Sequence, residues 1–137
     1  MGKGQQAGVS FAVDTTAPEG IDPHALQRLL QIASPEDGLE LLRRLKDDLA
    51  TAAAALEQDM ITGNRAGLRS GSHVLIALAG SIGAKSLEAE ARALNTTAHD
   101  ADAPLSVALM QSLTVRLADL RAHVAEVAAA TAGRPGA

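Results

Sequence analysis

The chain contains no cysteine, no tryptophan, no tyrosine and a single phenylalanine, Phe11, among its 137 residues. Without cysteine there is no disulfide framework and no thiolate chemistry. A core almost without aromatic rings must consist of Leu, Ile, Val, Met and Ala, which favours closely packed helices. The sequence also lacks an apolar run as long as a membrane span, and its first twenty residues lack the apolar segment of a signal peptide. A soluble cytoplasmic protein that does not bind membranes is therefore expected.

Several kinds of functional site are also missing from the sequence. The formal net charge is −4, whereas nucleic-acid binding needs a basic face, so nucleic acid is not an expected partner. No nucleophile–base–acid set and no phosphate-binding loop is recognisable, which argues against an independent enzyme. Di-metal helical bundles use Glu-x-x-His pairs, and none of the four histidines has Glu three positions before it. Because Asp119 and His123 are the one tidy i, i+4 pair, no metal site is expected.

Five helices are predicted from start signals, stop signals and the spacing of apolar residues. The first is expected to open at Asp22-Pro23 and the second at Ser34-Pro35, because proline is favoured at the first helical position after a capping side chain. Gly63-Asn64 should end the second helix and cap the third, which runs to about Gly83. The fourth helix is expected from about Lys85 to Ala98, and the fifth from Asp102-Ala103-Pro104 to about Ala130.

The long helices carry apolar residues at alternating steps of three and four, which is the pattern of a bundle helix. These residues are Leu42, Leu45, Leu49, Ala52 and Leu56; then Leu87, Ala91, Leu94 and Ala98; then Leu113, Leu117, Leu120, Val124 and Val127. No segment alternates with period two, so no sheet is expected. The predicted fold is all-α: an antiparallel four-helix bundle with a short additional N-terminal helix. It spans residues 21–131, between a flexible N-terminal arm at 1–20 and a flexible tail at 132–137.

The third helix contains one histidine, His73, within the stretch SGSHVLIALAGSIGA. At roughly 100° per residue, the apolar core face of this helix lies opposite His73. The histidine therefore points outward, with Arg69, Ile76, Ala77 and Gly80 beside it. An exposed Ile76 next to Ala77 and Gly80 would form a smooth apolar patch around the imidazole, and such patches often mark docking surfaces. An ordinary exposed histidine is the alternative; His24 and His123 are expected to be surface residues of that kind.

The segment HVLIALAGSIGAKSLEAEARAL, from His73 to Leu94, resembles the signature of histidine phosphotransfer (HPt) domains. The family pattern is a histidine, an aliphatic residue at i+2, usually lysine at i+3, usually glycine at i+4, and glycine at about i+10. His73, Leu75 and Gly83 match it, and a helix with leucine and alanine follows. The upstream Leu-rich helix and Gly63-Asn64 fit as well, so the resemblance spans roughly residues 21–130.

Two positions depart from the family pattern. The usual lysine, which in the family helps to neutralise the phosphoryl group, is replaced by Ile76, and the usual glycine by Ala77. Arg69, one turn before His73, is a candidate for the missing cation, and Lys85 is a second one; plain solvated charge is the alternative for both. Many family members place a polar side chain about 22 residues after the histidine, where it can hydrogen-bond the ring. Asn95 occupies that position, with His99 one turn beyond it.

The resemblance implies a phosphoryl carrier in a two-component phosphorelay. His73 would accept phosphoryl from the aspartate of a receiver domain and pass it to another receiver. The receiver would bring Mg²⁺, and this chain would need no cofactor of its own. The implied partners are response-regulator receiver domains and a sensor hybrid histidine kinase, and the carrier is expected to be a monomer without independent turnover. The alternative is a degenerate HPt-like adaptor that binds receiver or kinase domains without phosphotransfer, which the substitution of lysine by Ile76 supports.

Overall fold

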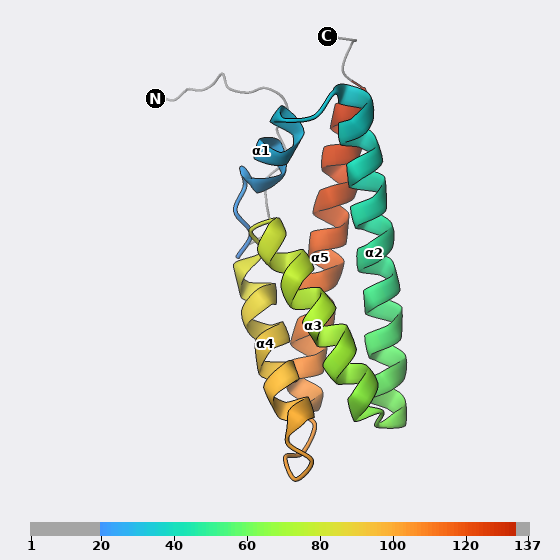
Figure 1. Ribbon diagram of the computed structural model, residues 1–137, viewed down its shortest axis with the longest axis vertical. Helices are drawn as coiled ribbons and strands as arrows, with labels where there is room; N and C mark the ends of the chain where they lie inside the picture. Colours follow the sequence, from blue (N-terminus) through green and yellow to red (C-terminus); the bar gives the residue numbers. More distant parts are fainter. Residues whose placement is uncertain (1–19, 134–137) are drawn as a thin grey trace.

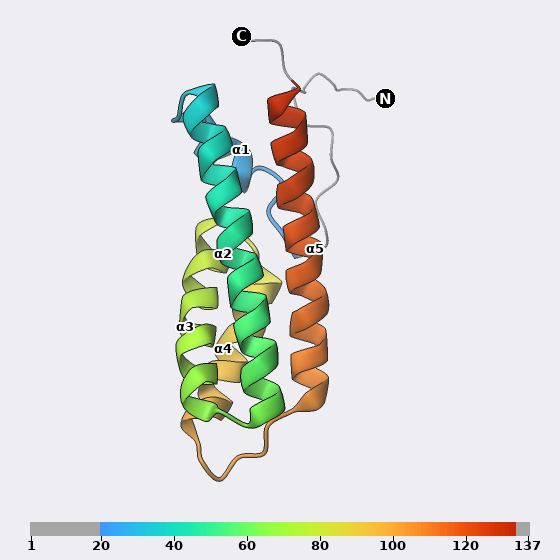
Figure 2. The same cartoon turned by 90° about the vertical axis from the view of Figure 1, so that its right-hand side faces the viewer.

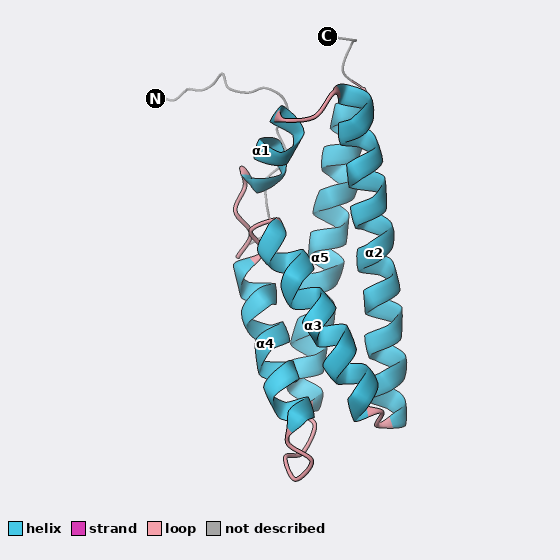
Figure 3. Ribbon diagram, in the orientation of Figure 1, coloured by secondary structure: helices cyan, strands magenta, loops and turns pink. Residues whose placement is uncertain are grey.

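The computed structural model describes residues 20–133 and folds them into five helices that pack together, with no strand in that range (Figures 1 and 3). The helices are α1 (Ala25–Gln31), α2 (Pro35–Thr62), α3 (Arg65–Ser81), α4 (Lys85–His99) and α5 (Val107–Ala132). The all-helical class predicted from the sequence is confirmed. The expected arm and tail lie outside the described residues, apart from positions 20, 132 and 133.

The predicted helix boundaries at both ends of α2 are confirmed. Ser34 Oγ accepts a hydrogen bond from the backbone N–H of Asp37 at 3.2 Å, and Pro35 is the first helical residue. At the other end, Gly63 adopts a left-handed conformation with φ of 69°, which a residue without Cβ enters at little cost. Asn64 then caps α3 by accepting from the N–H of Gly67 at 3.1 Å. These local interactions set the turn that brings α3 back along α2.

The first helix begins two residues later than expected. α1 starts at Ala25, while Asp22 accepts a hydrogen bond from the N–H of His24 at 2.9 Å and one from the Arg28 guanidinium at 2.7 Å. The Arg28 guanidinium beside Asp22 therefore lowers the pKa of that carboxyl, and the His24 N–H adds to the effect. Asp22 still organises the start of the helix, from outside it.

The predicted start of α5 at Asp102-Ala103-Pro104 is wrong. The helix begins at Val107, after Ser106, whose Oγ accepts from the N–H of Leu109 at 3.0 Å. The preceding residues form a loop held by Arg65 of α3, whose guanidinium donates to the backbone carbonyls of Asp100, at 2.8 Å, and Ala103. The local sequence of this segment favours the start of a helix, but its contact with Arg65 holds it as a loop.

The four longer helices contact one another in a ring: α2 packs on α3 and α5, and α4 packs on α3 and α5. Figure 2 shows α2 and α5 side by side, with α3 and α4 on the far side. The short α1 contacts α2 and lies at the end where α2 and α5 extend past α3 and α4 (Figures 1 and 2). The predicted apolar seams of α2, α4 and α5 are buried. Fully buried leucines such as Leu49, Leu56 and Leu75, each 0% exposed, contribute about 1.5–3 kcal/mol apiece.

The turn between α3 and α4 is tied to the start of α1. Gly83 has φ of 70°, and its carbonyl accepts from the N–H of Asp22 at 2.9 Å. A Cβ added at Gly83 would lie 2.7 Å from the Cβ of Asp22, so both the conformation and the space require glycine. This is the glycine that the HPt pattern places ten residues after the histidine.

His123 is buried, with 3% of its surface exposed, so its expected place on the surface is corrected. It lies on the buried side of α5, three residues after Leu120 and four before Val127. Burial lowers the pKa of the imidazole, because the charged form loses its hydration, and the Glu126 carboxylate opposes this weakly. Among the described residues Nδ1 has no hydrogen-bond partner.

Within residues 20–133, no helix combines the length and the apolar character needed to cross a membrane.

Candidate functional site on the α3–α4 face

His73 is at the midpoint of α3 and is exposed. Its environment follows from the helical period, because the core residues Leu68 and Leu75, both 0% exposed, occupy the opposite side. Ala77 and Gly80, one and two turns along the same face, are exposed as well. The imidazole is therefore accessible from solvent over a surface of small side chains, as the sequence predicts.

The contacts between α3 and α4 place these two helices in antiparallel register. Arg69 Nη1 donates to the carbonyl of Ala98 at 3.4 Å, and a Cβ at Gly80 would lie 3.6 Å from the Glu88 carboxylate. Between these two contacts, Asn95 donates a hydrogen bond to Ser72. His73 therefore lies at about the level of Asn95, and the side chains of α4 that flank this level complete the site.

Asn95 makes its hydrogen bonds to α3 immediately before His73. Its Nδ2 donates to Ser72 Oγ at 3.0 Å and to the carbonyl of Arg69 at 3.2 Å. Ser72 is 0% exposed and its hydroxyl donates to the same Arg69 carbonyl at 3.2 Å. The structure therefore gives Asn95 a role in joining the two helices beside the histidine, and its bond to the His73 ring stays a prediction. His99 Nδ1 lies 2.8 Å from the Asn95 carbonyl, on the exposed side.

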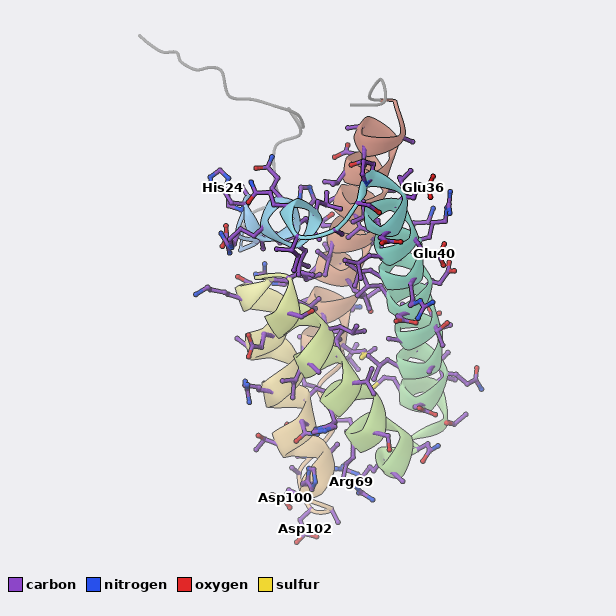
Figure 4. The ribbon with its side chains drawn as sticks, turned by 45° about the horizontal axis from the view of Figure 1, so that its top comes forward. His24, Glu36, Glu40, Arg69, Asp100 and Asp102 are labelled. Atoms are coloured by element: carbon purple, nitrogen blue, oxygen red, sulfur yellow. The ribbon has the colours of Figure 1, made fainter. Side chains whose placement is uncertain are left out.

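Arg69 and Lys85, the two cations proposed from the sequence, lie toward opposite ends of the α3–α4 contact. Arg69 is half-buried, and its guanidinium turns toward the last turn of α4. Figure 4 places it at the end of the molecule that also carries Asp100 and Asp102. Side chains of a helix lean toward its N-terminus, so this position of Arg69 is away from His73. Lys85 is exposed and is the first residue of α4, near the other end of the α3–α4 contact.

The expected exposure of Ile76 is corrected by the structure. Ile76 is half-buried and packs against the core, whereas Ala77 beside it is exposed. Ile76 therefore contributes to the packing of α3. The apolar surface around His73 is extended on its other side by Val74, which is 50% exposed.

Two arginines near the site were not singled out from the sequence. Arg92 on α4 donates to the Glu88 carboxylate at 2.8 Å, and the register of the two helices places it opposite Ile76. Its i, i+4 spacing from Glu88 is readable in the sequence as an ion pair. Arg65 holds the loop after α4, with Nη1 also donating to the carbonyl of Thr97 at 3.0 Å. That contact depends on how α3 and α4 pair, so no local pattern predicts it.

Within residues 20–133, no three His, Asp or Glu side chains gather in an arrangement that could hold a metal ion. The groups on the α3–α4 face instead include two exposed imidazoles, His73 and His99, the arginines described above, the Glu88 carboxylate and small apolar residues. Such a set can present a nucleophile to an incoming partner. Comparisons of this chain with protein-family models, curated proteins and solved structures find no match.

Proposed function

We propose that this chain is a phosphoryl carrier of the HPt type, an antiparallel four-helix bundle whose phosphoacceptor is His73. The observation that carries the proposal is the position of this imidazole: exposed, midway along α3, and next to the exposed small residues Ala77 and Gly80. A rigid helix fixes the nucleophile in space. The small exposed residues Ala77 and Gly80, which follow His73 on the outer face of α3, leave room for another protein's active site.

The proposed step is an in-line displacement at phosphorus. One unprotonated imidazole nitrogen of His73 attacks the phosphorus of an aspartyl phosphate on a receiver domain. The N–P bond forms as the acyl-phosphate P–O bond breaks, and the electron pair of that bond leaves with the receiver's carboxylate. The ring is left as a phosphorylated imidazolium, and its remaining N–H proton exchanges with water. Attack by the carboxylate of a second receiver reverses these events.

The partner supplies what this face lacks. A receiver domain contributes the aspartate and a Mg²⁺ ion that neutralises the transferred group, and a hybrid sensor kinase is the upstream source. The proposed docking surface consists of Ile76, Ala77 and Gly80, with Arg69, Lys85 and Asn95 supporting the histidine or its phosphoryl group. In this scheme the carrier acts as a monomer in the cytoplasm.

The test is incubation with receiver domains that carry labelled phosphoryl groups. The parent should become labelled through an acid-labile, base-stable linkage, and His73→Gln should stay unlabelled. His99→Gln is the matched control, because it removes another exposed imidazole from the same face. Label on His73→Gln, or loss of label in His99→Gln alone, would refute the assignment.

A second candidate, the degenerate adaptor, is favoured by Ile76, which packs against the core where the family usually has a cation. An adaptor would bind receiver or kinase domains through the same face without accepting phosphoryl. Stable binding of a phosphorylated receiver, with no label on the parent, would identify it.

A further inference from the structure

A phosphoryl group on His73 would bring about 1.5 to 2 negative charges to an exposed helix surface, so it calls for a cation within reach. The candidates named from the sequence are poorly placed for this. Arg69 donates to the carbonyl of Ala98. Lys85, by the register of α3 and α4, lies about ten residues along α3 from His73, which is about 15 Å at 1.5 Å per residue.

Arg92 lies closer to the histidine. The Ser72–Asn95 and Gly80–Glu88 contacts bracket the register, and they place Arg92 at the level of Ile76. This is one turn from His73, or about 4–5 Å along the helix axis. The side chain of Arg92 is 62% exposed, so its guanidinium is free to swing across the shallow surface between the two helices.

In the unmodified protein the Arg92 guanidinium has an anionic partner. Its Nη2 lies 2.8 Å from Glu88 Oε2, and the Glu88 side chain is only 27% exposed. Glu88 is next to Gly80, on the turn of α3 beyond Ile76. The ion pair therefore draws the guanidinium toward the level of Gly80, about two turns along α3 from His73. To reach a phosphoryl group on His73, the Arg92 side chain has to leave Glu88 and turn back along the α3–α4 surface.

Resting on the phosphocarrier function proposed above, we infer that Arg92 binds the phosphoryl group of His73 and that Glu88 competes with this group for the guanidinium. No covalent bond changes in the exchange. The guanidinium moves from a carboxylate with one negative charge to a phosphoryl group with a larger negative charge. A guanidinium–phosphate pair also forms two parallel hydrogen bonds. The ion pair thus holds the cation near Gly80, and a phosphoryl group on His73 would draw the guanidinium away from Glu88.

Each member of the pair then has an opposite effect on phosphorylation. Arg92→Gln should slow loading of His73 about three- to tenfold, the effect of one exposed arginine–phosphate contact. Glu88→Gln should speed loading about two- to threefold, because the guanidinium is no longer held. Arg92→Lys should restore part of the rate, since it keeps the charge and loses the two-pronged geometry.

The experiment uses phosphoramidate as a small donor, so that loading does not depend on docking of a receiver, and repeats the comparison with a phosphorylated receiver. Arg43→Gln is the matched control, because Arg43 also pairs with a glutamate one turn away, Glu40 at 3.3 Å, on the exposed surface of α2. It should load at the parent rate. All variants should melt close to the parent, since the arginine of each ion pair is mostly exposed to solvent.

The outcomes separate this inference from the proposed function. A parent that loads normally, together with Arg92→Gln that loads at the same rate, overturns the role of Arg92 and leaves His73 as acceptor. Slow loading of Arg69→Gln but not of Arg92→Gln assigns the cation to Arg69 and likewise overturns it. A parent that accepts phosphoryl from neither donor overturns both.

Discussion

Replacing Asn95 with alanine tests the contact that the structure places beside His73. The change removes two hydrogen bonds across the α3–α4 contact, to Ser72 Oγ at 3.0 Å and to the Arg69 carbonyl at 3.2 Å. Each contributes about 0.5–1.5 kcal/mol, and alanine returns roughly 0.5 kcal/mol through its higher helix propensity. We therefore expect Asn95→Ala to lower the free energy of unfolding by about 0.5–2.5 kcal/mol.

The assay is urea unfolding followed by circular dichroism for Asn95→Ala, Ser72→Ala and the double variant. Asn95 and Ser72 share one hydrogen bond, which each single variant already removes. The sum of the stability losses of the two single variants should therefore exceed the loss of the double variant by about 0.5–1 kcal/mol. Thr96→Ala is the control, since Thr96 is the exposed neighbour on α4 and gains helix propensity in the same way. It should leave stability nearly unchanged or raise it slightly.

The alternative is that Asn95 acts on the His73 ring alone. Asn95→Ala would then unfold like Thr96→Ala, and its effect on stability would be additive with that of Ser72→Ala. That result would refute the reasoning from the Ser72 and Arg69 contacts and would favour the hydrogen bond to the imidazole.

Three further predictions concern docking, pH and the α3–α4 turn. Ala77→Trp adds an indole on an exposed position, so it should melt like the parent yet block receiver binding in a titration; normal binding would exclude this face as the interface. Because burial lowers the pKa of His123 against the weaker opposing effect of Glu126, the unfolded chain binds the proton more readily. Stability should therefore fall as pH drops below about 6.5, by up to about 1.4 kcal/mol per pH unit until the lowered pKa is passed. His123→Leu should lose this dependence in urea unfolding at several pH values, and identical pH profiles would contradict it. Gly83→Ala forces a Cβ into positive φ, 2.7 Å from the Cβ of Asp22, so it should cost about 1–3 kcal/mol in urea unfolding; an unchanged midpoint would contradict the strain.

The parts of the fold that depend on local chemistry could be predicted from the sequence. Ser34 with Pro35, and Gly63 with Asn64, act through backbone groups within a few residues of themselves, so their roles are the same in any fold that contains these helices. The buried leucines also followed from their spacing, since a helix with one apolar face has one way to bury it.

The errors arise where a second helix decides the outcome. Asp102 and Pro104 have the chemistry of a helix start, but Arg65 holds the loop around them through its carbonyls. The polarity of His123 predicts a surface residue, whereas its spacing from Leu120 and Val127 puts it on the buried seam of α5. Because α5 packs on both α2 and α4, its buried face is wider than the single row of regularly spaced apolar residues, and it includes His123.

The candidate site was predicted in part. The outward direction of His73 follows from helical period alone. The partners of Asn95 and the position of Arg92 opposite Ile76 depend on the register between α3 and α4, which is set by contacts such as that of Gly80 with Glu88. The sequence of α3 alone therefore identifies the candidate nucleophile. Its neighbours on α4 can be identified only from the way the two helices pack together.

We propose that His73 carries a phosphoryl group between receiver domains. The most direct measurement is mass spectrometry of the intact chain and of its peptides, first after incubation with one phosphorylated receiver and then after addition of a second, unphosphorylated one. We predict that the mass rises by one phosphoryl group, that the group maps to His73, and that it then disappears from the chain and appears on the second receiver. Phosphoryl that maps to another residue, or a chain that gains none from receivers it binds, would contradict the account.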